Sequence, residues 1–331
     1  MSQNKLLEVI NLQTEFPYDK NKTVAAIHHI SFSMEEGEVL GLVGESGCGK
    51  SVTALSVMGL IANSNGLITE GEIYFKGQNL LTLDKRQRRQ IRGGAMSMIF
   101  QEPMSSLNPA MRIDKQIMEA IRLHTDLDKD QARALTRKLL VMVGIPDPDR
   151  VMKNYPHQLS GGMSQRVMIA LAMSCQPQLL IADEPTTALD VTIQAQILEL
   201  LRDIQKEKNT GILLITHDLG VVAEMCDRVI VMYAGEIVEA ANCQELFQTP
   251  LHPYTQGLIA SVPKLGSGRT SLPWIPGSVP DLLSMPEACR FAPRCPYATD
   301  KCRAEKPKLE AKAPGHQARC WYSDANLPAQ A

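Results

Sequence analysis

A glycine-rich octet, residues 44–51, has the residue types and the spacing of a phosphate-binding loop. It consists of Gly44, Glu45, Ser46, Gly47, Cys48, Gly49, Lys50 and Ser51, and it matches G-x-x-x-x-G-K-[ST] at every fixed position. Glycines let the backbone curve around a phosphate, and the helix expected next points unpaired N–H groups at the anion. We expect Lys50 to reach the β- and γ-phosphates and the Ser51 hydroxyl to hold Mg²⁺. The octet predicts binding of a nucleoside triphosphate.

Polar residues follow two apolar runs that are predicted to be strands. Asp183 and Glu184 come directly after residues 179–182, and His217 comes after residues 213–216. Parallel sheets place ligand chemistry at the carboxyl ends of their strands. There Asp183 can hold Mg²⁺ through water, Glu184 can orient or deprotonate the attacking water, and His217 can hydrogen-bond the γ-phosphate.

A second helix start has a pattern that can bind an anion. Ser160 can cap the helix expected over residues 165–173, and Gly161 and Gly162 leave its first N–H groups open. A plain capped helix is the alternative. A second open helix N-terminus in a nucleotide-binding chain favours a second phosphate contact.

The elements that position these residues predict an α/β fold. Strands that alternate with helices imply βαβ units and a mostly parallel sheet. The octet is expected between a buried strand, residues 39–43, and an apolar helix, residues 52–61. Ile30, Phe32 and Met34 alternate with serines, which is the pattern of a half-buried strand.

A helical insertion is predicted within this sheet, and a hairpin after it. Within residues 113–143, Leu135, Leu139 and Met142 recur at helical spacing, and Gly144, Pro146 and Pro148 are expected to end the helix. Residues 228–239 predict a hairpin that turns at Gly235.

Composition excludes several classes of protein. The 331 residues include 34 Lys and Arg and 36 Asp and Glu, so the charges nearly cancel. The chain as a whole therefore lacks the excess of basic residues that is typical of nucleic-acid-binding proteins. No apolar run approaches the roughly 18 residues of a membrane span. The N-terminus has no export pattern, so we expect a cytosolic protein whose eight cysteines are thiols or metal ligands.

The composition changes after residue 250. Twelve of the 20 prolines lie from Pro250 to the end of the sequence, which excludes long helices and predicts a separate irregular module. Cys289, Cys295, Cys302 and Cys320 lie in this module. Between Cys289 and Cys320 there are eight Lys and Arg but only three Asp and Glu. Four thiolates on a loop-rich segment suit a metal centre that acts as a local core, and Cys₄ serves both iron–sulfur clusters and zinc. Two disulfides are disfavoured in the cytosol.

The set of motifs resembles the ATP-binding subunit of ABC transporters over residues 1 to about 245. The further segments that carry the resemblance are Phe100-Gln101-Glu102-Pro103, Leu159-Ser160-Gly161-Gly162, Ala188-Leu189-Asp190 and Thr216-His217-Asp218. The resemblance implies a P-loop ABC ATPase core with an antiparallel β subdomain and a helical subdomain at about 103–175.

The resemblance also implies a role for each matched residue. The catalytic residues are Glu184, His217 and Gln101. Ser160, Gly161 and Gly162 form the signature that contacts the ATP of a partner domain. ATP and Mg²⁺ are bound by the whole octet with Gln101 and Asp183, while Phe16, in preference to Tyr18, stacks on adenine. Met163 stands at the position where ABC signatures most commonly have glutamine.

The C-terminal residues 246–331, here called the tail, narrow the resemblance to one group of ABC ATPases. His252-Pro253-Tyr254-Thr255 and Arg294-Cys295-Pro296-Tyr297-Ala298 resemble the end of the oligopeptide and dipeptide permease ATPases. This places the ATPase domain at 1–245 and a small Pro-rich C-terminal cysteine module at 246–331. It also implies a [4Fe–4S] cluster on the four tail cysteines, with zinc as the alternative.

The implied function is ATP hydrolysis that drives import of dipeptides and oligopeptides. The implied partners are a second ATPase subunit, in a heterodimer rather than a homodimer, two membrane permease subunits and an extracytoplasmic substrate-binding protein, with no nucleic acid. The chain would lie peripherally on the cytoplasmic face of the inner membrane. Nickel, glutathione or another small solute is the alternative cargo, and a soluble ABC ATPase of DNA repair or translation is the alternative class.

Cys48 within the octet leaves two hypotheses open. The first is a small residue that the loop tolerates. The second is a reactive thiolate, whose pKa is lowered by Lys50 and by the helix N-terminus.

Overall fold

The computed structural model describes residues 5–19, 22–187, 189–262 and 274–322. They form two compact units. The first contains residues 5–6, 34–38, 78–187 and 189–215; the second contains residues 7–19, 22–33, 39–77, 216–262 and 274–322.

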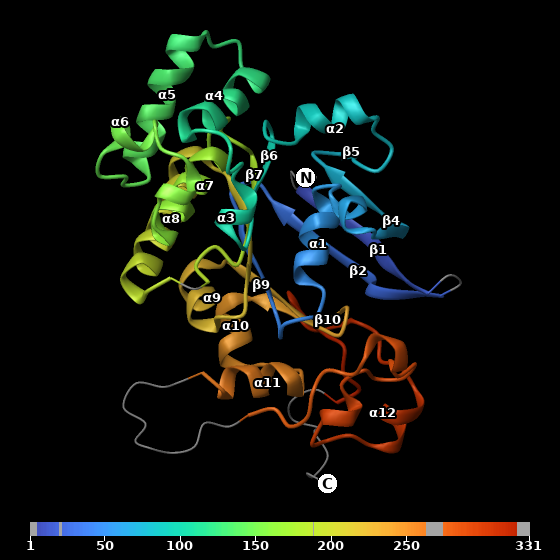
Figure 1. Cartoon of the computed structure of the whole chain (residues 1–331). Helices are drawn as coiled ribbons and strands as arrows, with labels where there is room; N and C mark the ends of the chain where they lie inside the picture. Colours follow the sequence, from blue (N-terminus) through green and yellow to red (C-terminus); the bar gives the residue numbers. More distant parts are fainter. Residues whose placement is uncertain (1–4, 20–21, 188, 263–273, 323–331) are drawn as a thin grey trace. The chain divides into compact units, whose positions relative to one another are not determined.

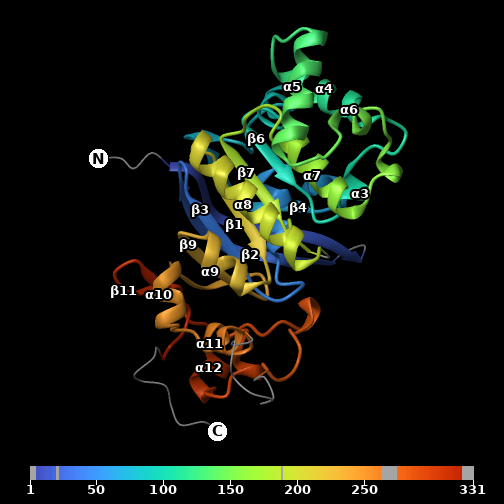
Figure 2. The same ribbon diagram turned by 90° about the vertical axis from the view of Figure 1, so that its left-hand side faces the viewer.

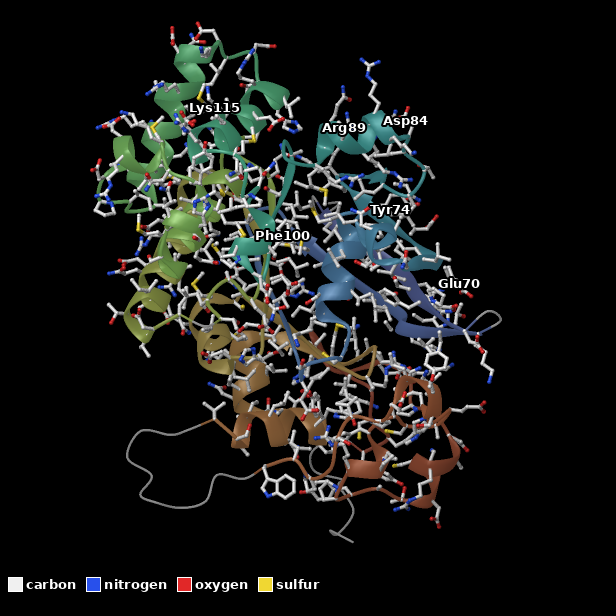
Figure 3. All side chains as sticks on the ribbon, viewed as in Figure 1. Glu70, Tyr74, Asp84, Arg89, Phe100 and Lys115 are labelled. Carbon is white, nitrogen blue, oxygen red and sulfur yellow. The ribbon has the colours of Figure 1, made fainter. Side chains whose placement is uncertain are left out.

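Parallel strands form the centre of the first unit. They are β6 (Met96–Ile99), β7 (Leu179–Asp183) and β8 (Gly211–Thr216), and β7 pairs with both of the others. Every residue of these strands is buried, which explains their continuous apolar runs. Their carboxyl ends lie at one edge, so Phe100, labelled in Figure 3, and then Gln101 leave the sheet beside residue 184.

The segment between β6 and β7 consists of helices joined by loops. Figures 1 and 2 both show α4, α5 and α6 grouped beside α7. The helices of this stretch are α3 (Pro103–Ser106), α4 (Ile113–His124), α5 (Lys129–Met142), α6 (Pro148–Val151), η2 (Pro156–Gln158) and α7 (Gly161–Ala172). The first unit also contains β5 (Gln78–Asn79), α2 (Lys85–Ile91) and α8 (Val191–Lys208). In Figure 3, Arg89 extends outward from α2.

The predicted helical insertion, residues 113–143, is not continuous in the structure. It is two helices, because Asp128 starts α5 with a capping box that Gln131 completes. The buried side of α5 contains Thr136 and Leu139, whereas Met142 is 42% exposed.

A mixed sheet forms part of the second unit. Its order is β11-β12-β10-β9-β3, in which β3 and β9 are parallel and the other pairs are antiparallel. The strands are β3 (Val39–Val43), β9 (Arg228–Tyr233), β10 (Glu236–Asn242), β11 (Glu310–Ala313) and β12 (His316–Ala318). The predicted hairpin is confirmed, and Ala234 and Gly235 both have positive φ, as a two-residue turn of its type requires. The tail contributes two strands to this sheet; the domain boundary at 245/246 stays a prediction.

An antiparallel pair, β1 (Lys5–Asp19) with β4 (Leu67–Phe75), belongs to a second sheet of this unit. On its other side β1 neighbours β2 (Lys22–Glu35), and Figure 3 labels Glu70 and Tyr74 on β4. Ile30, Phe32 and Met34 are buried, so the predicted alternation is confirmed.

Short helices complete the second unit. They are α1 (Lys50–Val57), η1 (Ile61–Ser64), α9 (Leu219–Met225), α10 (Cys243–Gln248), α11 (Pro253–Ala260), η3 (Leu282–Ser284), η4 (Ala292–Arg294) and α12 (Asp300–Ala304). The helix predicted over 52–61 begins earlier, at Lys50, and ends at Val57 because Gly59 has a left-handed φ of 63°. Within the described ranges, no helix has the length and apolar character needed to cross a bilayer.

Candidate nucleotide-binding site

The octet forms the turn between β3 and α1, as the phosphate-loop motif requires. Gly44 has a φ of 151°, and a Cβ there would lie 2.2 Å from the Met232 carbonyl oxygen. Gly49 has a φ of 104°, and its Cβ would lie 2.8 Å from the Ala26 oxygen. Only glycine fits these two positions, so the loop can wrap closely around an anion.

Lys50 lies inside this loop and is only 5% exposed. Its ammonium donates hydrogen bonds to the carbonyl oxygens of Gly44 at 2.7 Å and Glu45 at 3.0 Å. The loop's own carbonyl groups therefore hold the charge at the start of α1, where phosphate oxygens could accept the same hydrogen bonds.

The structure overturns the hypothesis that Cys48 is a reactive thiolate. Its side chain is fully buried, and burial raises the pKa of the thiol although the nearby Lys50 cation opposes this. Lys50 and the backbone N–H groups at the start of α1 act to lower this pKa, but burial outweighs them. Cys48 packs as a small residue.

Glu184 and Gln101 lie together in the first unit. The Gln101 amide nitrogen donates to Glu184 Oε2 at 3.1 Å, and the Thr187 hydroxyl donates to the same oxygen at 2.9 Å. Glu184 has a left-handed φ of 48°, and its N–H donates to the Ile215 carbonyl oxygen at 2.9 Å. A carboxylate oriented by two donors at the end of β7 is suited to positioning water.

Asp183 is the last residue of β7 and is 4% exposed. Its carboxylate and the Ser51 hydroxyl remain the predicted ligands of Mg²⁺. They belong to different units of the structure.

The signature residues form the start of α7. The Ser160 hydroxyl accepts a hydrogen bond from the Met163 N–H at 3.3 Å, so the predicted cap is present. A Cβ on Gly161 would meet nothing within 4 Å, which leaves this helix start accessible. The Gln165 amide donates to the Pro185 carbonyl oxygen at 2.6 Å and connects α7 to the chain beyond Glu184. This connection was not predicted, although Gln165 stands in the first turns of the predicted helix.

His217 belongs to the second unit. It lines a cavity of about 350 Å³ with Gly44 and Glu45 of the octet, and Leu258 and Trp274 of the tail line it too. The structure therefore brings His217 to the phosphate loop.

Two expectations from the family resemblance are untested: the stacking of Phe16 on adenine and the role of the motif at residues 188–190. Phe16 is half-buried on β1 against Gly66, whereas Tyr18 is 61% exposed. Ala188 lies outside the described residues, and Asp190, from the same motif, caps α8 by accepting from the Ile193 N–H at 3.0 Å.

Four tail cysteines line one small cavity of about 20 Å³, together with Phe291 and Trp321. The four are Cys289, Cys295, Cys302 and Cys320. Burial raises the pKa of the Cys295 thiol to about 12 and that of Cys320 to about 11. Among the described residues, no group of three or more His, Cys, Asp or Glu side chains is arranged to hold a metal ion. The expected metal centre is not confirmed.

Basic residues of the tail surround one buried carboxylate, that of Glu236 on β10. Arg290 approaches it at 3.3 Å and Arg319 at 3.9 Å, and Lys306 also contacts it. These cations compensate a carboxylate that is 2% exposed.

Two tail residues that the sequence did not single out contact the octet. Arg294 forms an ion pair with Glu45, and the Tyr254 hydroxyl accepts from the Glu45 N–H. Both lie within tail segments that carry the family resemblance, but nothing local to those segments predicts a contact with residue 45.

Comparisons with known proteins identify the family of this chain. Residues 27–187 match the family model of ABC transporters, and residues 238–302 match that of the oligopeptide/dipeptide transporter C-terminal region. The oligopeptide transport ATP-binding protein AppD of Bacillus subtilis is 52% identical, over 96% of each chain. The dipeptide transport ATP-binding protein DppD of Escherichia coli is 50% identical, over 98% of this chain and 99% of its own.

A solved structure shows the same fold. The dimeric, post-hydrolysis structure of the ATP-binding cassette MJ0796 with ADP and Pi has a TM-score of 0.64 and 26% identity to this chain. It covers 72% of this chain and 98% of its own. The predicted α/β ABC ATPase fold, with an antiparallel sheet and helical parts, is confirmed. The chain belongs to the ABC transporter family of ATPases, in the group that carries the oligopeptide/dipeptide transporter C-terminal region.

Proposed function

We propose that this chain is the ATP-hydrolysing subunit of an importer of dipeptides and oligopeptides. The observation that carries the proposal is the match over nearly the whole chain, tail included, to proteins named for dipeptide and oligopeptide transport. The tail matters most here, because the ATPase motifs alone are common to ABC proteins of many functions.

The chain's own residues supply the hydrolytic chemistry in this proposal. The octet's N–H groups and Lys50 bind the phosphates, while Ser51 and Asp183 hold Mg²⁺. Glu184, oriented by Gln101, activates the attacking water, and His217 contacts the γ-phosphate. Phe16 stacks on adenine.

The proposed assembly has two ATPase domains. One chain carries one octet and one signature, so Ser160, Gly161 and Gly162 contact the ATP held by a second ATPase subunit, with a heterodimer preferred. Two membrane permease subunits form the path, and an extracytoplasmic binding protein delivers the cargo. The ATPase lies peripherally on the cytoplasmic face of the membrane.

The tail cysteines are proposed to hold a [4Fe–4S] cluster, with zinc as the alternative. Four cysteines line one cavity and are of the type that both metals bind, but they would have to rearrange, because no group of the described side chains is already arranged to hold a metal ion. At about 20 Å³ this cavity is close to the size needed by a single water molecule, so zinc requires less rearrangement than a cubane cluster. In either case the metal would crosslink the loops that carry Cys289, Cys295, Cys302 and Cys320.

Uptake by cells tests the proposal. Cells lacking this chain are given labelled dipeptides and tetrapeptides, and then labelled nickel and glutathione. We expect loss of peptide uptake, restored by the wild-type chain but not by Glu184→Gln. Normal peptide uptake with loss of nickel or glutathione uptake would overturn the cargo. Purification from detergent extract without any membrane protein would favour the soluble class.

A further inference from the structure

Glu45 of the octet is held at three points within the second unit. Its carboxylate accepts from Arg294 Nη1 at 2.6 Å and from Nη2 at 3.0 Å, and its N–H donates to the Tyr254 hydroxyl at 2.9 Å. Its carbonyl oxygen accepts from Lys50 Nζ at 3.0 Å. Two of the three contacts come from the tail, and the third holds the lysine expected to bind phosphate.

The Arg294 side chain is fixed by its surroundings before it reaches Glu45. It is 4% exposed, its Nε donates to the Pro276 carbonyl oxygen at 2.8 Å, and Nη2 reaches the Ile275 oxygen at 3.3 Å. Its Cζ lies 5.7 Å from the centre of the Tyr233 ring. A planar guanidinium with this many partners can hold a carboxylate in only one orientation.

Tyr254 is fixed as firmly. It is fully buried on α11, and its ring centre lies 4.8 Å from that of Tyr233 and 5.5 Å from that of Phe291. The hydroxyl at the end of this packed ring therefore has a defined position. It ties down the N–H of Glu45, directly after the glycine that begins the octet.

We propose that Arg294 and Tyr254 are positioning residues for nucleotide binding, because they fix Glu45 and thereby the carbonyl groups that orient Lys50. The phosphate-binding loop is completed by the tail, some 200 or more residues away in sequence. Arg294 directly precedes Cys295, so the folding of the cysteine-lined cavity and the geometry of the octet are mechanically linked. The inference depends on ATP binding by the octet and not on the transported cargo.

The test measures the Kd of the full-length chain for a fluorescent ATP analogue with Mg²⁺. Coupling between sites in proteins typically changes affinity 5- to 150-fold, so we expect Arg294→Gln to weaken binding about 5-fold or more. Arg294→Lys keeps the charge but not the two-pronged contact and should recover only part of the affinity. The matched control is Arg303→Gln, an arginine of the same tail whose side chain is 58% exposed, and it should bind normally. Unchanged affinity in Arg294→Gln would overturn the proposal.

A double-mutant cycle separates positioning from general destabilisation. Arg294→Gln and Glu45→Gln remove the same contact. The fold-change in Kd of the double variant should therefore be much smaller than the product of the two single fold-changes. Glu45→Gln with Arg303→Gln should be multiplicative. If Arg294→Gln and Glu45→Gln multiply, the contact does not act through Glu45 and the proposal fails. If Arg294→Gln does not fold, Tyr254→Phe, which keeps the packed ring and loses only the hydroxyl, takes its place: normal affinity in that variant overturns the proposal.

Discussion

The Gln101 amide nitrogen lies 3.1 Å from Glu184 Oε2, although 83 residues separate the two in sequence. The contact connects the segment after β6 with the end of β7, and the neighbouring strands place both segments at one edge of the sheet. Because Thr187 donates to the same oxygen, Oε2 has a defined position. This arrangement supports Glu184 as the residue that orients or deprotonates water.

Glu184→Gln should bind ATP with near-normal affinity and lose nearly all turnover. General-base catalysis contributes about 10²- to 10⁴-fold, and the amide cannot accept a proton from water. The measurement is steady-state hydrolysis in the assembled complex, with nucleotide affinity determined alongside. Glu199→Gln, which removes an exposed carboxylate from α8, is the matched control and should hydrolyse ATP normally.

Lys50→Ala should show the opposite pattern, because it removes a phosphate contact and leaves Glu184 in place. Nucleotide affinity itself should fall. A Glu184→Gln chain with near-normal turnover, or a Lys50→Ala chain with normal affinity, would refute the assigned roles.

Local patterns made much of this fold predictable, and distant contacts limited the rest. The octet and the alternation of Ile30, Phe32 and Met34 with serines depend on neighbouring residues, so they could be recognised directly. Leu135, Leu139 and Met142 recur at helical spacing in α5, but the buried side of this helix contains Thr136 and Leu139 and leaves Met142 exposed. Spacing alone does not say which of two overlapping stripes faces a neighbour.

The predicted site residues illustrate the same limit. Gln101 and Glu184 were found separately from motifs, and their contact required the register of β6 and β7. Arg294 was noticed only as part of a tail motif. Its partner, Glu45, is 249 residues away, and no local pattern connects them.

Cys48 should react slowly with alkylating reagents in the folded protein. It is fully buried and burial raises its pKa, so little thiolate is exposed to reagent near pH 8. Mass spectrometry of peptides from iodoacetamide-treated protein measures this, and protein unfolded in guanidinium shows full labelling for comparison. Cys48→Ser should hydrolyse ATP within about twofold of the wild type, as expected for a conservative change of a small residue. Rapid labelling of Cys48 that ATP prevents would revive the reactive-thiolate hypothesis.

His252 should make the fold less stable as the solution becomes acidic. Burial lowers its pKa from 6.5 to about 4; the Glu239 carboxylate opposes this shift and Arg319 adds to it. Between pH 6.5 and 4 the unfolded chain therefore binds a proton at this histidine that the folded chain does not bind. The free energy of unfolding therefore decreases as the pH is lowered. The loss from this group is about 2 kcal/mol by pH 5.

The variant that tests this is His252→Asn. His252 Nδ1 accepts from the Tyr254 N–H at 3.1 Å at the start of α11, and asparagine can supply that acceptor without titrating. Thermal unfolding at pH 7 and pH 5 should show a smaller difference for His252→Asn than for the wild type. His157→Asn, which removes an exposed imidazole, should behave like the wild type. An unchanged difference in His252→Asn would rule out this residue as the origin.

The tail cysteines should bind metal when the protein is purified without oxygen. Burial raises the pKa of the Cys289, Cys295 and Cys320 thiols. Without a bound metal ion they therefore stay protonated and pack as apolar groups. A metal reverses this balance, because it binds thiolates and releases their protons. We expect brown protein with about four irons and matching sulfide per chain.

Cys302→Ser should lose this metal, since it removes one of the four thiolates expected to bind it at the cavity. Cys175→Ser, which changes a half-buried thiol in the first unit, is the control and should keep full metal content. Stoichiometric zinc without iron or sulfide would replace the cluster by the zinc alternative, and protein without metal would exclude the site. If metal binds, its loss in Cys302→Ser should also weaken ATP binding in the direction of Arg294→Gln, because Arg294 lies next to Cys295 and holds Glu45.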